Sequence, residues 1–100
     1  MSGRSAEAHA RIVEEIAREK AATLGRAGER LEAALAEVAE IARAWRAADD
    51  TERDRLAADY DRAWRAAETA RHTLLIQREA VGLRQHRDMD VQFPRPPRRL

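Results

Sequence analysis

The stretch Ala44-Trp45-Arg46-Ala47-Ala48-Asp49-Asp50-Thr51-Glu52 reads as the end of one long helix and the start of another. Asp49 with Glu52 three residues later resembles a capping box, with aspartate in place of the usual serine or threonine. Asp50, followed by Thr51 and Glu52, is an equally good acidic start for a helix. The sequence therefore predicts a tight turn at residues 49–50 between two long helices.

The residues before the turn predict one helix over about 5–48, after a disordered segment at residues 1–4. Ser5 suits the N-cap position, and no proline follows until residue 94. Apolar side chains then repeat at spacings of 4 and 3, as in a helix that packs along one seam. Gly25 and Gly28 interrupt this pattern, and each costs about 1 kcal/mol relative to alanine in a helix interior. They mark either a break in the helix or a close helix crossing within a continuous one. The seam residues are Leu31, Leu35, Val38, Ala42 and Trp45.

The residues after the turn carry a second seam with the same alternating spacing. Gly82 suits the C-cap, so this helix is expected to end at about residue 82, or to run on to residue 86. When the two seams are paired outward from the turn, the numbers of facing residues sum to 101 or 102 at every layer. Gly28 then faces Leu74, and a close crossing there favours a continuous first helix. The second seam comprises Leu56, Tyr60, Ala63, Ala67, Ala70, Leu74, Gln77 and Val81.

The fold class predicted is therefore all-α: a long antiparallel helical hairpin over residues 5–87, similar to a coiled coil and rich in alanine. Aromatic residues make up only 4% of the chain, so a lone hairpin would bury little apolar area. Several apolar residues also lie off the seams, and a helix that is apolar on two sides is normally buried on two sides. We expect a homodimer in which two hairpins form a four-helix bundle. Its interface, or that with an unknown protein partner, is predicted at Ile12, Val13, Ile16, Trp64, Leu75, Ile76 and Leu83.

The residues 88–100 are expected to form an extended tail, because the prolines at 94, 96 and 97 remove amide donors and restrict the residues before them. Pro94 and Pro97 with the following Arg98 form a P-x-x-P-R sequence, which proline-recognition domains bind as a polyproline helix. The alternatives are a frayed basic terminus and a strap across the partner subunit. A further alternative folds Val91 and Phe93 over Ile12 and Ile16. The predicted tail contacts are Val91, Phe93, Pro94, Pro97, Arg98 and Arg99.

The charge distribution argues against a nucleic-acid-binding body. The net charge is +1, with −2 over residues 1–83 and +3 over residues 84–100. Weak binding of nucleic acid or another anionic surface through the tail is the alternative function. The chain has no cysteine, which fits a reducing cytoplasm, and no apolar run approaches the ~20 residues that span a membrane.

The sequence offers no catalytic or metal-binding motif. No glutamate is followed by histidine three residues later, the pattern that carboxylate-bridged metal sites in helical bundles use. Glu68 and His72 are four residues apart, but His72 is expected on the face opposite the seam. We therefore expect no cofactor and no enzymatic activity. The function predicted is that of a small structural or adaptor protein that acts through self-association and protein–protein contacts.

Overall fold

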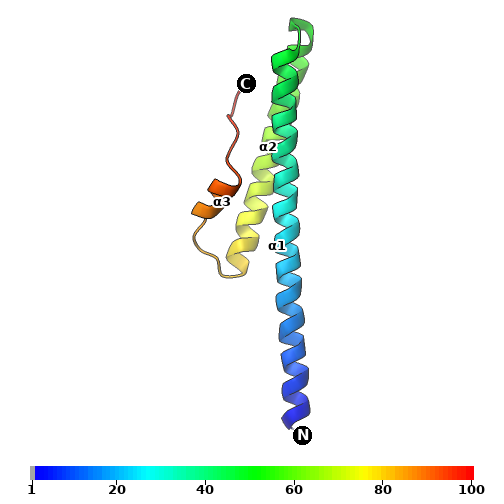
Figure 1. Cartoon of the computed structure of the whole chain (residues 1–100), viewed down its shortest axis with the longest axis vertical. Helices are drawn as coiled ribbons and strands as arrows, with labels where there is room; N and C mark the ends of the chain where they lie inside the picture. Colours follow the sequence, from blue (N-terminus) through cyan, green and yellow to red (C-terminus); the bar gives the residue numbers. More distant parts are fainter. Residues whose placement is uncertain (1) are drawn as a thin grey trace.

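The computed structural model describes residues 2–100 and contains three helices in a rod of 75 × 22 × 15 Å (Figure 1). Helices α1 (Ser2–Ala47) and α2 (Asp50–Ala80) pack together as a hairpin, and the short α3 (Arg87–Gln92) follows. Over the described residues the chain has no strand. The prediction of an all-helical hairpin is therefore confirmed.

The turn is formed by Ala48 and Asp49, one residue earlier than the predicted 49–50, because Asp49 is the N-cap and Asp50 is the first residue of α2. The Asp49 carboxylate accepts a hydrogen bond of 3.0 Å from the backbone N–H of Glu52 and one of 2.6 Å from the Thr51 hydroxyl. These bonds lower the pKa of Asp49, the hydroxyl bond most, because they favour the charged carboxylate. The predicted capping arrangement is present on the Asp49 side, and the Glu52 carboxylate pairs with Arg55.

The end of α2 is a Schellman motif centred on Gly82. The backbone N–H of Leu83 donates to the Arg78 carbonyl at 2.9 Å, and that of Gly82 donates to the Glu79 carbonyl at 3.0 Å. Gly82 has a φ of +92°, a conformation that residues with a Cβ rarely adopt. This motif ends α2 at Ala80, so the extension to residue 86 is wrong and the Gly82 cap is confirmed.

Two apolar clusters form the core along the hairpin. The cluster nearer the turn joins Val38 to Tyr60, Ala63 and Ala67, with Ala42 packed against it. The other joins Ala27 and Leu31 to Leu74 and Met89, with partly buried Leu24, Leu35, Ala70, Leu75 and Phe93 around them. The clusters contain the predicted facing pairs Ala42 with Tyr60, Val38 with Ala63 and Leu31 with Ala70.

Helix α1 is continuous through Gly25 and Gly28, as predicted, but the reason given for the glycines is wrong. A Cβ atom added at either position would meet no atom within 4 Å, so neither glycine allows a close approach of α2. Ala27, which is buried, packs in the cluster with Leu74 instead. The start of α1 also differs, because the helix begins at Ser2 and includes Ser5, while Met1 lies outside the described residues.

Substituting Gly25 or Gly28 by alanine is expected to stabilise the chain by about 1 kcal/mol each, since alanine lowers the backbone entropy of the unfolded state. The new methyl group has open space at both positions. Urea unfolding followed by circular dichroism measures the change in the free energy of unfolding. Gly82→Ala is the matched control and should destabilise, because its φ of +92° strains any residue with a Cβ.

Helix α1 extends well beyond the end of α2 (Figure 1). In the hairpin register Ala80 lies near residue 21, so residues 2–20 form a free segment, which we call the arm. Every arm residue from Gly3 onward is exposed. At 1.5 Å per residue the arm is about 28 Å long.

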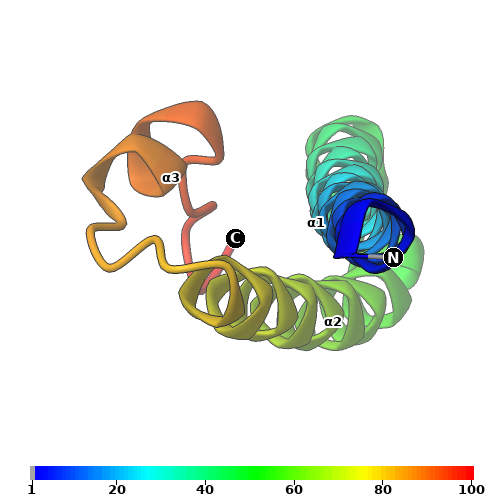
Figure 2. The same ribbon diagram turned by 90° about the horizontal axis from the view of Figure 1, so that it is seen from below.

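The residues 84–100, which we call the strap, reverse direction after α2 and run back toward the turn (Figure 1). Viewed along the rod, α1 and α3 both lie above α2, at the right and at the left, and the C-terminal end of the strap lies between them (Figure 2). The prediction that the strap is extended from residue 88 is wrong over Arg87–Gln92, where α3 forms with Met89 buried in the core. The proline segment after Phe93 is non-helical, as predicted.

Candidate functional site

The strap is anchored to α2 by Arg71, whose side chain is only 4% exposed. The Arg71 guanidinium donates at 2.6 Å to the Phe93 carbonyl and at 3.4 Å to the Asp90 carboxylate. Glu68 lies 3.9 Å from it on the same helix. A buried charge needs such partners, because removal from water is costly without them. Arg71 therefore ties the end of α3 to the middle of α2.

A second arginine, Arg78, holds the start of the strap. Its guanidinium donates to the Asp88 carboxylate at 2.7 Å, the Gln85 carbonyl at 3.0 Å and the His86 Nδ1 at 3.3 Å. The bond from Arg78 holds the pKa of Asp88 below its usual value. Arg78 thus fixes the loop that leads from α2 into α3.

The proline segment lies against the aromatic residues of α2. The Trp64 Nε1 donates to the Pro96 carbonyl at 3.2 Å, and the Tyr60 hydroxyl donates to the Pro97 carbonyl. The Arg98 guanidinium stacks 4.5 Å from the centre of the Trp64 ring and pairs with Asp61 at 2.8 Å. Burial raises the pKa of Tyr60, which keeps its hydroxyl protonated as a donor. The carbonyls of Pro96 and Pro97, which have no partner within the proline segment, thus accept hydrogen bonds from the side chains of α2.

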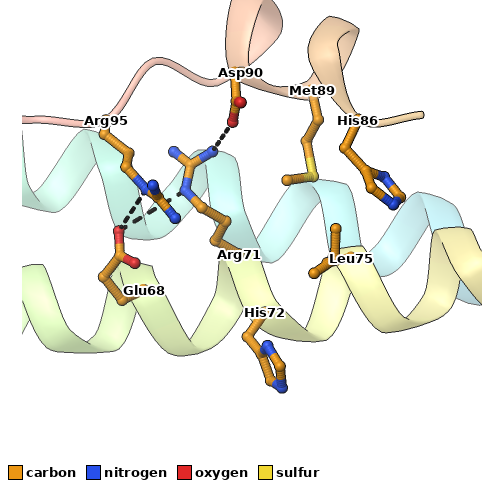
Figure 3. Close-up of a pocket in the computed structure, with 8 residues that line it drawn as sticks. All are labelled: Glu68, Arg71, His72, Leu75, His86, Met89, Asp90 and Arg95. Carbon is orange, nitrogen blue, oxygen red and sulfur yellow. Dashed lines mark hydrogen bonds and ion pairs between the residues drawn. The ribbon is translucent and has the colours of Figure 1, made fainter. Parts of the chain in front are cut away.

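A small cavity of about 240 Å³ lies between α2 and the strap, and Figure 3 shows the residues that line it. Arg95 pairs with Glu68 at 3.1 Å beside the Arg71–Asp90 pair, while the exposed side chain of His72 points away from the strap. No group of metal-ligating side chains occurs over residues 2–100. The charged residues that line this cavity form ion pairs that hold the strap against α2.

Acid is expected to release the strap before it unfolds the hairpin. The pKa of Asp61 lies below its usual value of 3.8 because Arg98 and then Arg65 bond to the carboxylate, and Asp88 is lowered by Arg78. Groups with a lowered pKa stabilise the docked strap above about pH 4, and this contribution is lost as the pH falls through their docked values. Trp64 fluorescence in a Trp45→Phe background should report release below pH 4 with the helical circular dichroism retained.

Replacement of both carboxylates, Asp61→Asn with Asp88→Asn, should remove this acid transition. The control Asp50→Asn, which lies at the start of α2 and has no strap contact among the hydrogen bonds and ion pairs, should leave it in place. An acid transition that survives the double substitution would show that other groups control docking.

The predicted interface residues separate into covered and exposed sets. Trp64 and Leu75 are half-buried, the first under the proline segment and the second against the core cluster that includes Met89. Ile12, Val13 and Ile16 on the arm are 55%, 51% and 48% exposed. The remaining exposed members are Ile76 and Leu83.

The predicted tail residues separate in the same way. Phe93 packs on the core, Pro97 and Arg98 bind α2, and Pro94 lines a groove beside α1. Arg99 lines a hollow with Trp45 near the turn. Val91 is 78% exposed, so the alternative in which it covers Ile12 and Ile16 is wrong. The strap therefore packs on α2 of its own chain.

Three residues that anchor the strap, Arg71, Arg78 and Met89, were not predicted from the sequence. Arg71 is seven residues before Arg78 on α2, so both lie on one helix face. Met89 is an apolar residue between two aspartates, which is a weak signal of burial. The two arginines at this spacing, on the face beside the seam, were the one signal in the sequence that a polar segment packs there.

Comparisons of the chain with protein-family models, with curated proteins and with solved structures found no match. None of the helices over residues 2–100 combines the length and the apolar character needed to cross a membrane.

Proposed function

We propose that this chain is a non-enzymatic structural or adaptor protein that acts through self-association of its helices and through contacts with a protein partner. The observation that carries this proposal is the arm, a helix of about 28 Å. No other segment within residues 2–100 covers it, and it exposes three aliphatic side chains in one turn and a half. An isolated helix without a packed face is marginal in water, so a partner would stabilise it.

The strap supports the same proposal in a different way. It covers the aromatic residues Tyr60 and Trp64, while the three aliphatic residues of the arm stay exposed. The strap's Arg95 and Arg98 are paired with acidic residues of α2, which favours a role in folding over the alternative of binding nucleic acid.

The four-helix bundle predicted from the sequence is one form that self-association can take. An open groove of about 430 Å³ lies between α1 and the strap, bordered by Gly25 and Gly28 on α1 and by Phe93 on the strap. Two hairpins docked side by side would use this groove, and alanine at either glycine would then weaken the dimer. A location in the cytoplasm, which the absence of cysteine favours, is part of the same proposal.

Sedimentation equilibrium over a range of chain concentrations tests the proposal. We expect a concentration-dependent rise from the chain mass of 11.3 kDa toward twice that value. Replacing Ile12, Val13 and Ile16 together by serine should keep the chain at the monomer mass. A chain that stays monomeric at millimolar concentration would contradict self-association.

A further inference from the structure

We infer that the face of α2 around Trp64 is a recognition site for proline-rich peptides with arginines three residues apart. The chain's own proline segment is the ligand seated on this site, and a peptide of the same chemistry from a protein partner binds in its place. The inference rests on the proposed function for the existence of a protein partner, but it does not depend on self-association.

The proline segment runs along α2 in the opposite direction, with its polar contacts in order. As the residue numbers of the segment rise, those of its partners on α2 fall. The contacts join Arg95 to Glu68 at 3.1 Å, the Pro96 carbonyl to Trp64 at 3.2 Å and Arg98 to Asp61 at 2.8 Å. Both arginines and a carbonyl between them therefore have a partner on one face of one helix.

The two carboxylates of α2 have the spacing that a polyproline helix presents. Glu68 and Asp61 are seven residues apart, so they lie on nearly the same side of α2, about 10 Å apart along its axis. A polyproline helix has three residues per turn and rises about 3.1 Å per residue, which places Arg95 and Arg98 on one side, about 9 Å apart. The prolines favour this conformation because their rings fix φ. The site thus matches one turn of such a ligand.

Two aromatic side chains supply the donors that a proline ligand needs. A polyproline helix makes no internal hydrogen bonds, so its carbonyls are available to accept from outside. The Trp64 Nε1 and the Tyr60 hydroxyl donate to the carbonyls of Pro96 and Pro97. The Arg98 guanidinium lies 4.5 Å from the centre of the Trp64 ring. An aromatic-lined surface with a partner for a flanking arginine is the means by which proline-rich segments are recognised.

The proline segment is exchangeable because its ion pairs are accessible to water and the buried anchors of the strap lie elsewhere. The side chains of Arg98 and Asp61 are 44% and 43% exposed, and exposed ion pairs contribute little to stability. The buried residues Arg71 and Met89 hold α3 and its end at Phe93. The proline segment can therefore leave α2 while α3 stays docked. A separate peptide then competes with a tethered segment, whose effective concentration its short tether sets.

A synthetic peptide of residues 93–100, acetylated and labelled with fluorescein, tests the inference by fluorescence anisotropy. The full chain with Arg95→Glu and Arg98→Glu should release its own segment, because glutamates then face Glu68 and Asp61. This released variant should bind the peptide at least about tenfold more tightly than the unsubstituted chain, since the tethered competitor is gone. Both arginines are exposed, so circular dichroism should show an unchanged hairpin.

The spacing is tested with a second peptide that has one more proline between Pro96 and Pro97. The extra residue moves the second arginine by about 3 Å and rotates it by a third of a turn. Its affinity for the released variant should fall at least about tenfold, and equal affinity of the two peptides would overturn the inference.

The Asp61–Arg98 pair provides a test of specificity with its own rescue. The released variant should prefer the native peptide to one that carries Arg98→Glu. In a chain with Asp61→Arg this preference should reverse, because the charges of the pair are exchanged. The matched control Glu37→Arg makes the same change at an exposed carboxylate of α1 and should keep the preference for the native peptide.

Three results would overturn the inference. The first is no binding of the native peptide to the released variant at millimolar concentration. The second is equal binding to the released variant and to the unsubstituted chain, which places the peptide on another surface. The third is a preference that does not reverse in the Asp61→Arg chain. Sedimentation measures self-association separately, so a chain that dimerises but binds no peptide refutes this inference and leaves the proposed function standing.

Discussion

The variant Arg71→Ala is expected to detach the strap from α2 while the hairpin remains helical. Arg71 donates to the Phe93 carbonyl and the Asp90 carboxylate from a buried position. Hydrogen bonds of charged groups contribute about 1.5–3 kcal/mol each. Because Asp90 is largely exposed, its share is at the low end, and docking of the strap should weaken by about 2–4 kcal/mol in all. Hydrogen exchange measures this directly, since the amides of α3 should lose their protection.

Two further variants separate the causes. Arg71→Met keeps most of the aliphatic stem but no donor, so equal loss of protection assigns the effect to the hydrogen bonds. Arg43→Ala removes an exposed arginine paired with Glu40 on α1 and should leave the protection of α3 unchanged. If α3 remains protected in Arg71→Ala, the other contacts of the strap, such as those of Met89 and Arg78, hold α3 without Arg71.

The variant Leu31→Ala is expected to lower the free energy of unfolding by about 2–5 kcal/mol. Leu31 is fully buried and joins α1 to Leu74 and to Met89 of the strap, so truncation leaves a cavity that three segments line. Denaturant unfolding followed by circular dichroism measures the change. Leu83→Ala, at an exposed leucine, should change the free energy by less than about 0.5 kcal/mol. A loss below 1 kcal/mol for Leu31→Ala would show that this layer contributes little.

The hairpin was predictable because its signals are local and repeated. Asp49 caps α2 through its own side chain, Gly82 ends α2 through its backbone, and both appear as short motifs in the sequence. The seams follow from helix periodicity, which needs no knowledge of tertiary structure. The register followed from the turn, because a tight turn leaves one way to pair the two helices.

The strap was not predictable in detail because its contacts are made between distant residues of different types. Arg71 bonds to a backbone carbonyl 22 positions away, and no periodic pattern marks such a bond. The explanation of the glycines in α1 was wrong for a different reason, because it relied on periodicity alone. Gly28 fell at a seam position, but helix packing rotated Ala27 into the contact with Leu74, a shift of one residue that periodicity alone does not determine.

We expect the tight turn at Asp49 also to set the order in which the chain folds. Ala42 and Tyr60 are 18 positions apart and Leu31 and Leu74 are 43 apart, so the contacts nearest the turn close the shortest loops and cost the least chain entropy. We expect the hairpin to nucleate at the turn and to close progressively toward Leu74. The strap binds a surface that exists only once α2 has formed, so it docks last. The arm gains no contact in this sequence of events, so its helix is stabilised only by its own backbone hydrogen bonds and by its continuity with the rest of α1.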